Sequence, residues 1–301
     1  MATSLADILD NFVKNHDNRQ LLVLPLAILA VSLLILLVSF VNSGSPVILG
    51  MDFQGGTQIS IETADSPAVL EKMYSSYPLT DIRQAGSRVI MQFGVMDNDQ
   101  QQQLETDVTG HYSNVQIQHI GPTYGKNLQI QAIQAICISF IGMSIVVFLI
   151  FRTLIPSLAV ILSAFSDIII AAAFMRVAGI ELSLGTLAAL LMLIGYSVDS
   201  DILLTNRVIK RRGTVDEKVS RAMHTGITMT TTTLAALAVM YLVSTFSYLV
   251  IPSFTQITLL SQISIVLIAG LFADMMNTWL LNTGILRWYV MKPEFRGRYN
   301  R

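Results

Sequence analysis

From residue 190 to residue 212 the sequence reads LLMLIGYSVDSDILLTNRVIKRR, and this stretch decides the fold. It begins as a helix apolar enough to cross a membrane, carries Asp199 and Asp201, and ends in a basic cluster. An aspartate near the centre of a bilayer costs about 2.5–3.5 kcal/mol on insertion scales. Such acids usually face the interior of a helix bundle and mark a path for ions or protons. The stretch therefore predicts a membrane protein with ionisable groups inside its spans.

The two acids of this stretch point to different neighbours. On a helix with 3.6 residues per turn, Asp199 and Asp201 lie about 200° apart, so one partner cannot serve both. Asp201 shares a polar stripe with Ser197 and Thr205. The side of Asp199 holds Gly195, Tyr196 and Asn206. A purely structural role for the two acids stays open, and a functional role is the leading interpretation.

The composition agrees with a membrane protein. Of 301 residues, 52% are hydrophobic and only 13% are charged, whereas soluble domains usually carry about 25% charged residues. The single cysteine, Cys137, lies in an apolar run, so an intrachain disulfide is impossible and a cysteine-based metal site is not expected. We expect Cys137 to pack against apolar side chains, and no motif predicts a cofactor or a metal site.

The first predicted span is a retained anchor. Residues 1–20 are mostly polar, and residues 21–41 form an uninterrupted apolar run. That run is long enough to cross the ~30 Å hydrocarbon core of a bilayer. Its length and the absence of an A-x-A cleavage site distinguish it from a signal peptide.

Residues 42–127 have a different character, with nine acidic residues against four basic ones, a net charge of −5. Their pattern predicts strand, helix, strand, strand, helix, strand, which is the order of a ferredoxin-like domain. The expected strands are 56–62, 82–85, 88–93 and 115–120, with a hairpin turn at 86–87, and the expected helices are 67–76 and 99–112. His111 and His119 lack the spacing of metal ligands and are expected at the surface. We predict a small α+β domain outside the lipid.

Five more spans are predicted between residues 128 and 290. They cover residues 128–151, 156–176, 182–206, 225–246 and 257–290. The last is too long for one perpendicular crossing and is expected to tilt or to continue along the membrane surface. The predicted fold class is an α-helical membrane protein with six spans and one ferredoxin-like domain.

Charge predicts the orientation in the membrane. The connection at residues 207–223 holds six basic residues against two acidic ones, and the tail at residues 291–301 is also basic. By the positive-inside rule both are cytoplasmic, so the N-terminus is cytoplasmic too and the domain at 42–127 is extracytoplasmic. A nucleic-acid patch is another interpretation of the basic connection, and the rule makes it unnecessary.

Several motifs carry a family resemblance. Residues 50–57, GMDFQGGT, are similar to a GxDFxGGT motif that opens an extracytoplasmic domain, and they contain Asp52, Phe53, Gly55, Gly56 and Thr57. Residues 120–126, IGPTYGK, resemble a segment that leads into a second span. Residues 194–197, IGYS, resemble a fourth-span signature that includes Gly195, Tyr196 and Ser197. Arg207 follows Asn206 where the same proteins have Asp-Arg. On these motifs the chain resembles archaeal-type SecF proteins of the SecD/SecF family. Gly55 and Gly56 are expected at a turn with positive φ.

This resemblance implies a function in protein export. The family belongs to the RND-like superfamily, in which six spans form one half of a pseudo-twofold bundle. The resemblance implies that a SecD-like subunit forms the other half. It also implies that the pair assists unfolded preproteins through the Sec translocon channel in the cell membrane, using the proton or ion gradient. The implied partners are SecD, the translocon, preproteins and membrane lipid, with no nucleic acid and no enzymatic activity.

The candidates for a proton or ion relay are inferred from depth and charge. They are Asp199, Asp201, Asp167 and Asp274, ranked in this order. Asp199 ranks first because residues 198–202, VDSDI, resemble the SecD-type VDANV pattern. The chain departs from the family at several further positions: the usual SecF aspartate aligns with Ser200, and Thr225 stands where bacterial members carry an arginine. Asp274 stands where the family usually has small polar residues, and Asp167 matches only the second member of a third-span His-Asp pair.

Two other classes of protein share parts of this pattern. An RND-like exporter of lipids or other hydrophobic small molecules has a similar bundle but usually carries both halves in one chain. An intramembrane aspartyl protease needs two acids that meet across helices, such as Asp199 with Asp167 or Asp274. It also needs a GxGD-like motif, which this chain lacks. Assistance to protein export is the leading interpretation.

Overall fold

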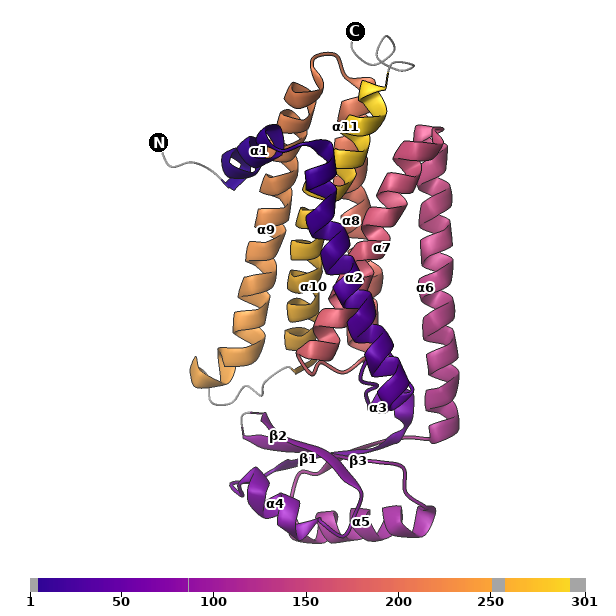
Figure 1. Cartoon of the computed structure of the whole chain (residues 1–301). Helices are drawn as coiled ribbons and strands as arrows, with labels where there is room; N and C mark the ends of the chain where they lie inside the picture. Colours follow the sequence, from indigo (N-terminus) through magenta and orange to yellow (C-terminus); the bar gives the residue numbers. More distant parts are fainter. Residues whose placement is uncertain (1–4, 86, 251–257, 293–301) are drawn as a thin grey trace.

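The chain forms a helical bundle with a small α+β domain at one end (Figure 1). A computed structural model describes residues 5–85, 87–250 and 258–292. As predicted, six helical segments in this part of the chain are long and apolar enough to cross a membrane. The α+β domain is named the sheet domain below, and the opposite end of the bundle is named the far end. The predicted fold class is therefore confirmed.

The six spans follow the apolar runs of the sequence. They are α2 (Asn18–Ser43), α6 (Pro122–Phe151), α7 (Leu154–Val177), α8 (Leu184–Lys210), α9 (Val215–Val250) and a last run made of α10 (Thr258–Met276), the π-helical segment η1 (Asn277–Asn282) and α11 (Thr283–Met291). Gly44 ends α2 at φ 73°, where its N–H donates to the carbonyl oxygen of Phe40. This left-handed conformation is the usual way a glycine terminates a helix.

The sheet domain has the predicted order of elements. Its strands are β1 (Gly56–Glu62), β2 (Leu79–Ala85), β3 (Arg88–Phe93) and β4 (Gln116–Ile120), and its helices are α3 (Met51–Gln54), α4 (Pro67–Met73) and α5 (Asn98–His111). The strands lie in the order β2-β3-β1-β4 and every pair is antiparallel, which is the ferredoxin-like arrangement. Residue 86, in the predicted hairpin turn, lies outside the described residues.

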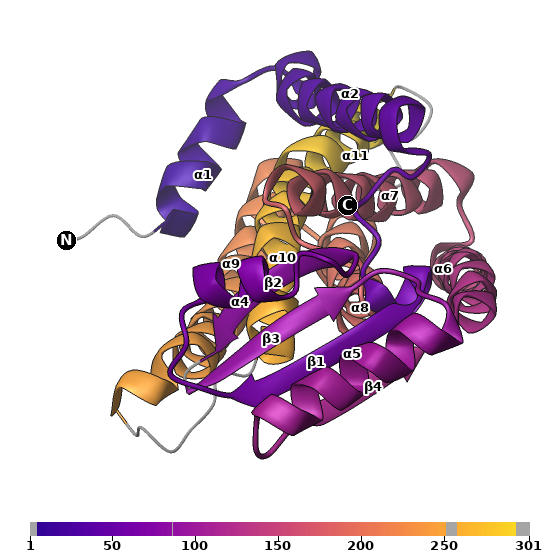
Figure 2. The same ribbon diagram turned by 90° about the horizontal axis from the view of Figure 1, so that it is seen from below.

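The two faces of the sheet contact different parts of the chain. Figure 2 shows α4 and α5 lying across the face that points away from the spans. Ile59 and Ile61 of β1 alternate toward these helices and are fully buried with Leu104 and Val108 of α5. Successive residues of a strand point to opposite faces, so the residues of β1 that alternate with Ile59 and Ile61, such as Gln58, turn toward the spans. The sheet thus presents a polar face to the bundle.

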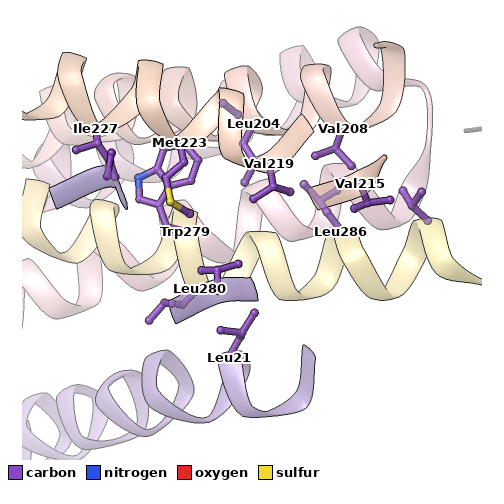
Figure 3. Packing of buried hydrophobic residues seen from close by; sticks show 14 of the residues in the cluster. Leu21, Leu204, Val208, Val215, Val219, Met223, Ile227, Trp279, Leu280 and Leu286 are labelled. Carbon is purple, nitrogen blue, oxygen red and sulfur yellow. The ribbon is translucent and has the colours of Figure 1, made fainter. Parts of the chain in front are cut away.

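A second core holds the far end together around Trp279. Figure 3 shows Leu204 and Val208 of α8, Met223 and Ile227 of α9 and Leu21 of α2 arranged around Trp279 and Leu286. Trp279 is 1% exposed. A Cβ on Gly226 would collide with the Trp279 ring, so this glycine lets α9 approach the indole closely. The core ties the last span to the first, fourth and fifth.

Three details differ from the sequence predictions. Residues 5–15 form a helix, α1 (Leu5–Asn15), because Ala6, Leu9 and Val13 recur at helical spacing and pack against the far-end core. The basic connection at 207–223 is mostly helical, since α8 extends to Lys210 and α9 begins at Val215. Cys137 is exposed instead of packed, because α6 lies at the edge of the bundle and buries few residues. His111 and His119 are exposed, as expected.

Gly55 and Gly56 have φ of 83° and 136°, which confirms the predicted turn. A Cβ on Gly55 would lie 2.8 Å from Pro122 Cα, and one on Gly56 would collide with the carbonyl oxygen of Phe93. The backbone at this point therefore accepts only glycine without rearrangement.

We predict that Gly56→Ala destabilises the chain, because the positive φ alone costs about 1–3 kcal/mol and the collision adds to it. Gly110→Ala is the matched control, since that glycine lies within α5 with open space around its Cβ. Alanine there should stabilise the helix by about 0.5–1 kcal/mol. Thermal unfolding of the full chain in detergent measures both variants. Equal melting temperatures for the two variants would contradict this account.

Candidate functional site

Three of the four predicted acids meet in the middle of the bundle. Asp167 of α7, Asp201 of α8 and Asp274 of α10 are 0%, 0% and 1% exposed. The ion pairs that the described residues make involve none of these three carboxyl groups. This set of residues is named the acid cluster below.

Asp167 is held by donors from two other helices. The hydroxyl of Ser197, on α8, donates to Asp167 Oδ2 at 2.5 Å. The side-chain amide of Asn277, in η1, donates to Asp167 Oδ1 at 2.6 Å. Both carboxyl oxygens therefore have a donor, and α7 is joined to α8 and to the last span at the same point.

Asp201 and Asp274 share one hydroxyl. Thr278 Oγ1 lies 2.9 Å from Asp201 Oδ1 and 3.1 Å from Asp274 Oδ1. The side-chain amide of Asn282 also donates to Asp201 Oδ1, at 2.8 Å. A hydroxyl carries one hydrogen, so Thr278 donates to only one of the two carboxyl groups at a time.

The π-helical segment places these donors. All six residues of η1 are buried, and Asn277, Thr278 and Asn282 all point toward the acids. A π-helix is wider than an α-helix and is uncommon except as a single turn, often at a functional site. Its position beside three buried carboxyl groups fits that rule.

Several oxygens of the site have no hydrogen-bond partner among the described residues. They are Asp201 Oδ2, Asp274 Oδ2, Asn277 Oδ1, Asn282 Oδ1, Ser163 Oγ, Ser166 Oγ and Thr205 Oγ1. Each is buried, and a buried polar atom without a partner costs about 1–3 kcal/mol. No group of three or more acidic, histidine or cysteine side chains among the described residues is placed to hold a metal ion, whereas a carboxyl oxygen without a partner can take up a proton. The arrangement can therefore accept positive charge.

Asp199 lies elsewhere. It is exposed on the outer side of α8 and makes no hydrogen bond or ion pair within the described part of the chain. Ala188, Met192, Gly195 and Tyr196 are exposed on the same side, at helical spacing. This set, with Asp199, is named the α8 stripe below. The structure thus does not bring Asp199 to Asp167 or Asp274, the pairs considered for a protease.

The residues of the GMDFQGGT motif form a joint between the sheet domain and the spans. Asp52 Oδ2 accepts a hydrogen bond of 2.9 Å from the N–H of Leu184, the first residue of α8. Phe53 is 1% exposed and packs with Ala132 of α6 and Leu187 of α8. Its carbonyl oxygen accepts a hydrogen bond of 2.7 Å from the Gln129 side chain. The motif therefore connects the sheet domain directly to the helix that carries Asp201.

A polar cavity of about 300 Å³ lies beside this joint. Its lining includes Asp52, Arg83 of β2 and Glu181, which precedes α8. Burial raises the pKa of the Glu181 carboxyl above its ordinary value; the guanidinium of Arg83 offsets part of the shift, and the charges of Asp81 and Asp52 add to it. The junction between the sheet domain and the spans therefore combines this polar cavity with the apolar packing of Phe53.

Thr57 and Arg207 have structural contacts of their own. Thr57 is 1% exposed, and its hydroxyl lies 3.1 Å from His119 Nδ1 on β4.

Arg207 donates to the carbonyl oxygen of Arg221 at 2.6 Å and to Thr225 Oγ1 at 3.0 Å. Arg207 thus joins the end of α8 to α9.

The sequence analysis missed Asn277, Thr278 and Asn282. Together with Asp274 they form a polar stripe at spacings of three, four and eight residues inside an apolar run. The same reasoning that grouped Ser197, Asp201 and Thr205 would have found them. The π-helical segment that gathers them has no sequence signature.

The fold and the acid cluster define a multi-pass membrane protein with one ferredoxin-like domain outside the spans and ionisable groups within them. Residues 100–292 match the protein family described as "Protein export membrane protein SecD/SecF, C-terminal". The protein-export membrane protein SecF of Methanolacinia petrolearia is 49% identical over 93% of this chain and 96% of its own length. The SecF protein of Pyrococcus furiosus is 40% identical over 95% of this chain and 98% of its own length. The chain belongs to the SecD/SecF family of protein-export membrane proteins.

A solved structure shows the same fold. The crystal structure of SecDF from Thermus thermophilus, a translocon-associated membrane protein, matches with a TM-score of 0.69 at 18% identity. The match covers 93% of this chain and 38% of that chain, so the chain spans well under half of the SecDF protein. The exporter and protease alternatives find no support in these comparisons.

Proposed function

We propose that the chain is one half of a SecD–SecF complex that assists preprotein translocation by the Sec translocon and draws energy from a proton or ion gradient. In this proposal the far end is cytoplasmic, the sheet domain is extracytoplasmic and handles emerging preproteins, and the acid cluster is the ion site. The acid cluster is the observation that carries the proposal. Family membership supports the export role, and the cluster supports the coupling.

The electrostatics of the cluster require positive charge from outside the protein. Three ionised carboxylates without a cationic neighbour would each lose several kcal/mol of hydration free energy on burial and would repel one another. Bound protons or a small cation remove that cost. The two short contacts of Thr278 point the same way: while Thr278 donates to one carboxylate, its contact with the other is a hydrogen bond only if that carboxyl is protonated.

The joint offers a route from the cluster to the sheet domain. Asp52 is bonded to the first residue of α8, and Asp201 lies on the same helix. A change in the charge of the cluster that shifts α8 would therefore reach the sheet domain through Asp52 and the polar cavity beside it. We propose this route as the coupling between ion movement and the handling of preproteins.

The α8 stripe supports a SecD-like partner. An unpaired aspartate that faces lipid costs about 2.5–3.5 kcal/mol near the bilayer centre, and Asp199 is exposed in this chain. Small residues such as Gly195 and Ala188 let a second helix approach closely. We propose that the stripe packs against the other half of the pseudo-twofold bundle, where Asp199 gains a partner.

The ion-coupling proposal predicts that Asp201→Asn removes gradient-dependent stimulation of export. The change keeps the size of the side chain but removes the group that accepts a proton. One elementary charge is worth ~2.3 kcal/mol per 100 mV, or a factor of about 50, so we expect stimulation to fall at least about tenfold. Proteoliposomes with the SecD-like partner and the translocon, assayed with and without a gradient, measure it.

Asp199→Asn is the matched control on the same helix, and it should retain gradient-dependent stimulation because Asp199 lies outside the acid cluster. Normal stimulation with Asp201→Asn, or an equal loss with both variants, would reject the acid cluster as the coupling site. It would leave the export role itself untouched.

The partner proposal predicts that Gly195→Leu weakens the complex with a SecD-like subunit at least about tenfold by blocking close helix approach. A Cβ on Gly195 meets no other atom within 4 Å, so the chain itself has room for the side chain. Gly142→Leu is the control, because Gly142 on α6 is equally open. Co-purification in mild detergent measures both. Undiminished recovery of the partner with Gly195→Leu would place the interface elsewhere.

A further inference from the structure

We propose that the far end of the molecule holds a binding site for a phosphate-bearing anion, in a pocket between the end of α8 and the start of α9. The pocket has a volume of about 610 Å³. Six basic side chains line it: Arg207, Lys210, Arg211, Arg212, Lys218 and Arg221. The export function does not require this site, and the proposal stands independently of the acid cluster.

The positive-inside rule explains how many basic residues lie at this end but not why they share one cavity. Basic residues that only set topology can spread around the helix ends and project into water. Here the last turn of α8, the short connection and the first turns of α9 direct six of them to the same pocket. This convergence is the geometry of an anion site.

The local acids do not neutralise the pocket. Glu217 lies 3.7 Å from Arg221, and both side chains are largely exposed, which makes this a weak ion pair. Asp216 pairs instead with Arg287 of α11, at 3.0 Å. Among the described residues, the basic side chains that line the pocket outnumber the acids beside them.

Two of the basic residues are held in place before any anion binds. Arg207 is fixed by its hydrogen bonds to the carbonyl oxygen of Arg221 and to Thr225 Oγ1. Lys218 is only 2% exposed, and its Nζ lies 3.5 Å from the carbonyl oxygen of Val208. Preorganised cations lose less conformational freedom on binding.

Phosphate fits this pocket best among common anions. Guanidinium groups bind phosphate through paired N–H donors, and lysine binds it as a point charge. None of the described lining residues is aromatic, whereas sites for single-stranded nucleic acid usually stack bases on aromatic rings. Because α8 spans the membrane and ends in the pocket, the site lies where lipid headgroups begin. The phosphate could belong to an anionic lipid or to a soluble phosphate compound.

The test uses the purified full chain in detergent and two probes. Native mass spectrometry measures binding of phosphatidylglycerol, with zwitterionic phosphatidylcholine for comparison, and calorimetry measures binding of inorganic pyrophosphate. The variant is Arg211→Gln with Arg212→Gln, two exposed side chains. The matched control is Arg152→Gln with Lys292→Gln, which removes two positive charges from the same end but outside the pocket. Arg221→Gln serves as a second variant if the double variant fails to fold.

We expect at least one probe to bind the unchanged chain. If phosphatidylglycerol binds, it should be preferred over phosphatidylcholine. The affinity of the probe for the pocket variant should be at least about tenfold lower. The control should change less than about twofold, and binding should weaken as salt rises. Binding of phosphatidylglycerol alone identifies a lipid headgroup as the source, and binding of pyrophosphate identifies a soluble one. Equal losses in variant and control, binding of neither probe, or binding only of an RNA oligonucleotide would overturn the proposal.

Discussion

The burial of three carboxyl groups that have no cationic partner among the described residues is the constraint on which the rest of the structure depends. Asp167, Asp201 and Asp274 come from three different helices; Asp167 and Asp201 accept hydrogen bonds from side chains of other spans, whereas Asp274 contacts Thr278 of its own span. The bundle therefore cannot rearrange at this level without leaving a buried carboxyl unpaired, at a cost of about 1–3 kcal/mol or more. The donors that prevent this come from a π-helical segment that is itself locked by Trp279 beneath Gly226.

Helix α8 connects every part of the molecule that has a proposed role. Its first residue is bonded to Asp52 of the sheet domain, its middle carries Ser197 and Asp201, and its last turn carries Arg207. Its exposed side carries Asp199. The acid cluster, the contact with the sheet domain and the basic pocket therefore share one continuous helix. The polar cavity beside Asp52 lies at the junction of α8 with the sheet domain.

The six spans and the ferredoxin-like domain could be predicted from the sequence because each depends on a local pattern of apolar residues. The apolar runs exceed the thickness of a bilayer, and the alternation around Ile59 and Ile61 marks a strand with one buried face. The sequence was also sufficient to place Asp199 and Asp201 on opposite sides of one helix. It could not show that Asp201 is buried and Asp199 exposed, because a local motif does not show which side of a helix faces the other spans.

The other features that the sequence did not predict also depend on how elements pack together. The donors in η1 depend on a π-helical segment that local sequence does not encode, and the exposure of Cys137 depends on α6 lying at the edge of the bundle. The helix α1 is short, and tertiary packing decides whether such a helix forms. Each outcome depends on which elements meet in space.

Infrared difference spectroscopy of the full chain in lipid tests most directly whether the acid cluster takes up positive charge. The carbonyl stretch of a protonated carboxyl group is separate from that of a carboxylate, and it shifts when a hydrogen bond to the group changes. The account predicts a carboxyl band that appears and disappears as pH or cation concentration is varied, and that is lost in Asp201→Asn but kept in Asp199→Asn. Identical difference spectra for the unchanged chain and Asp201→Asn would contradict it.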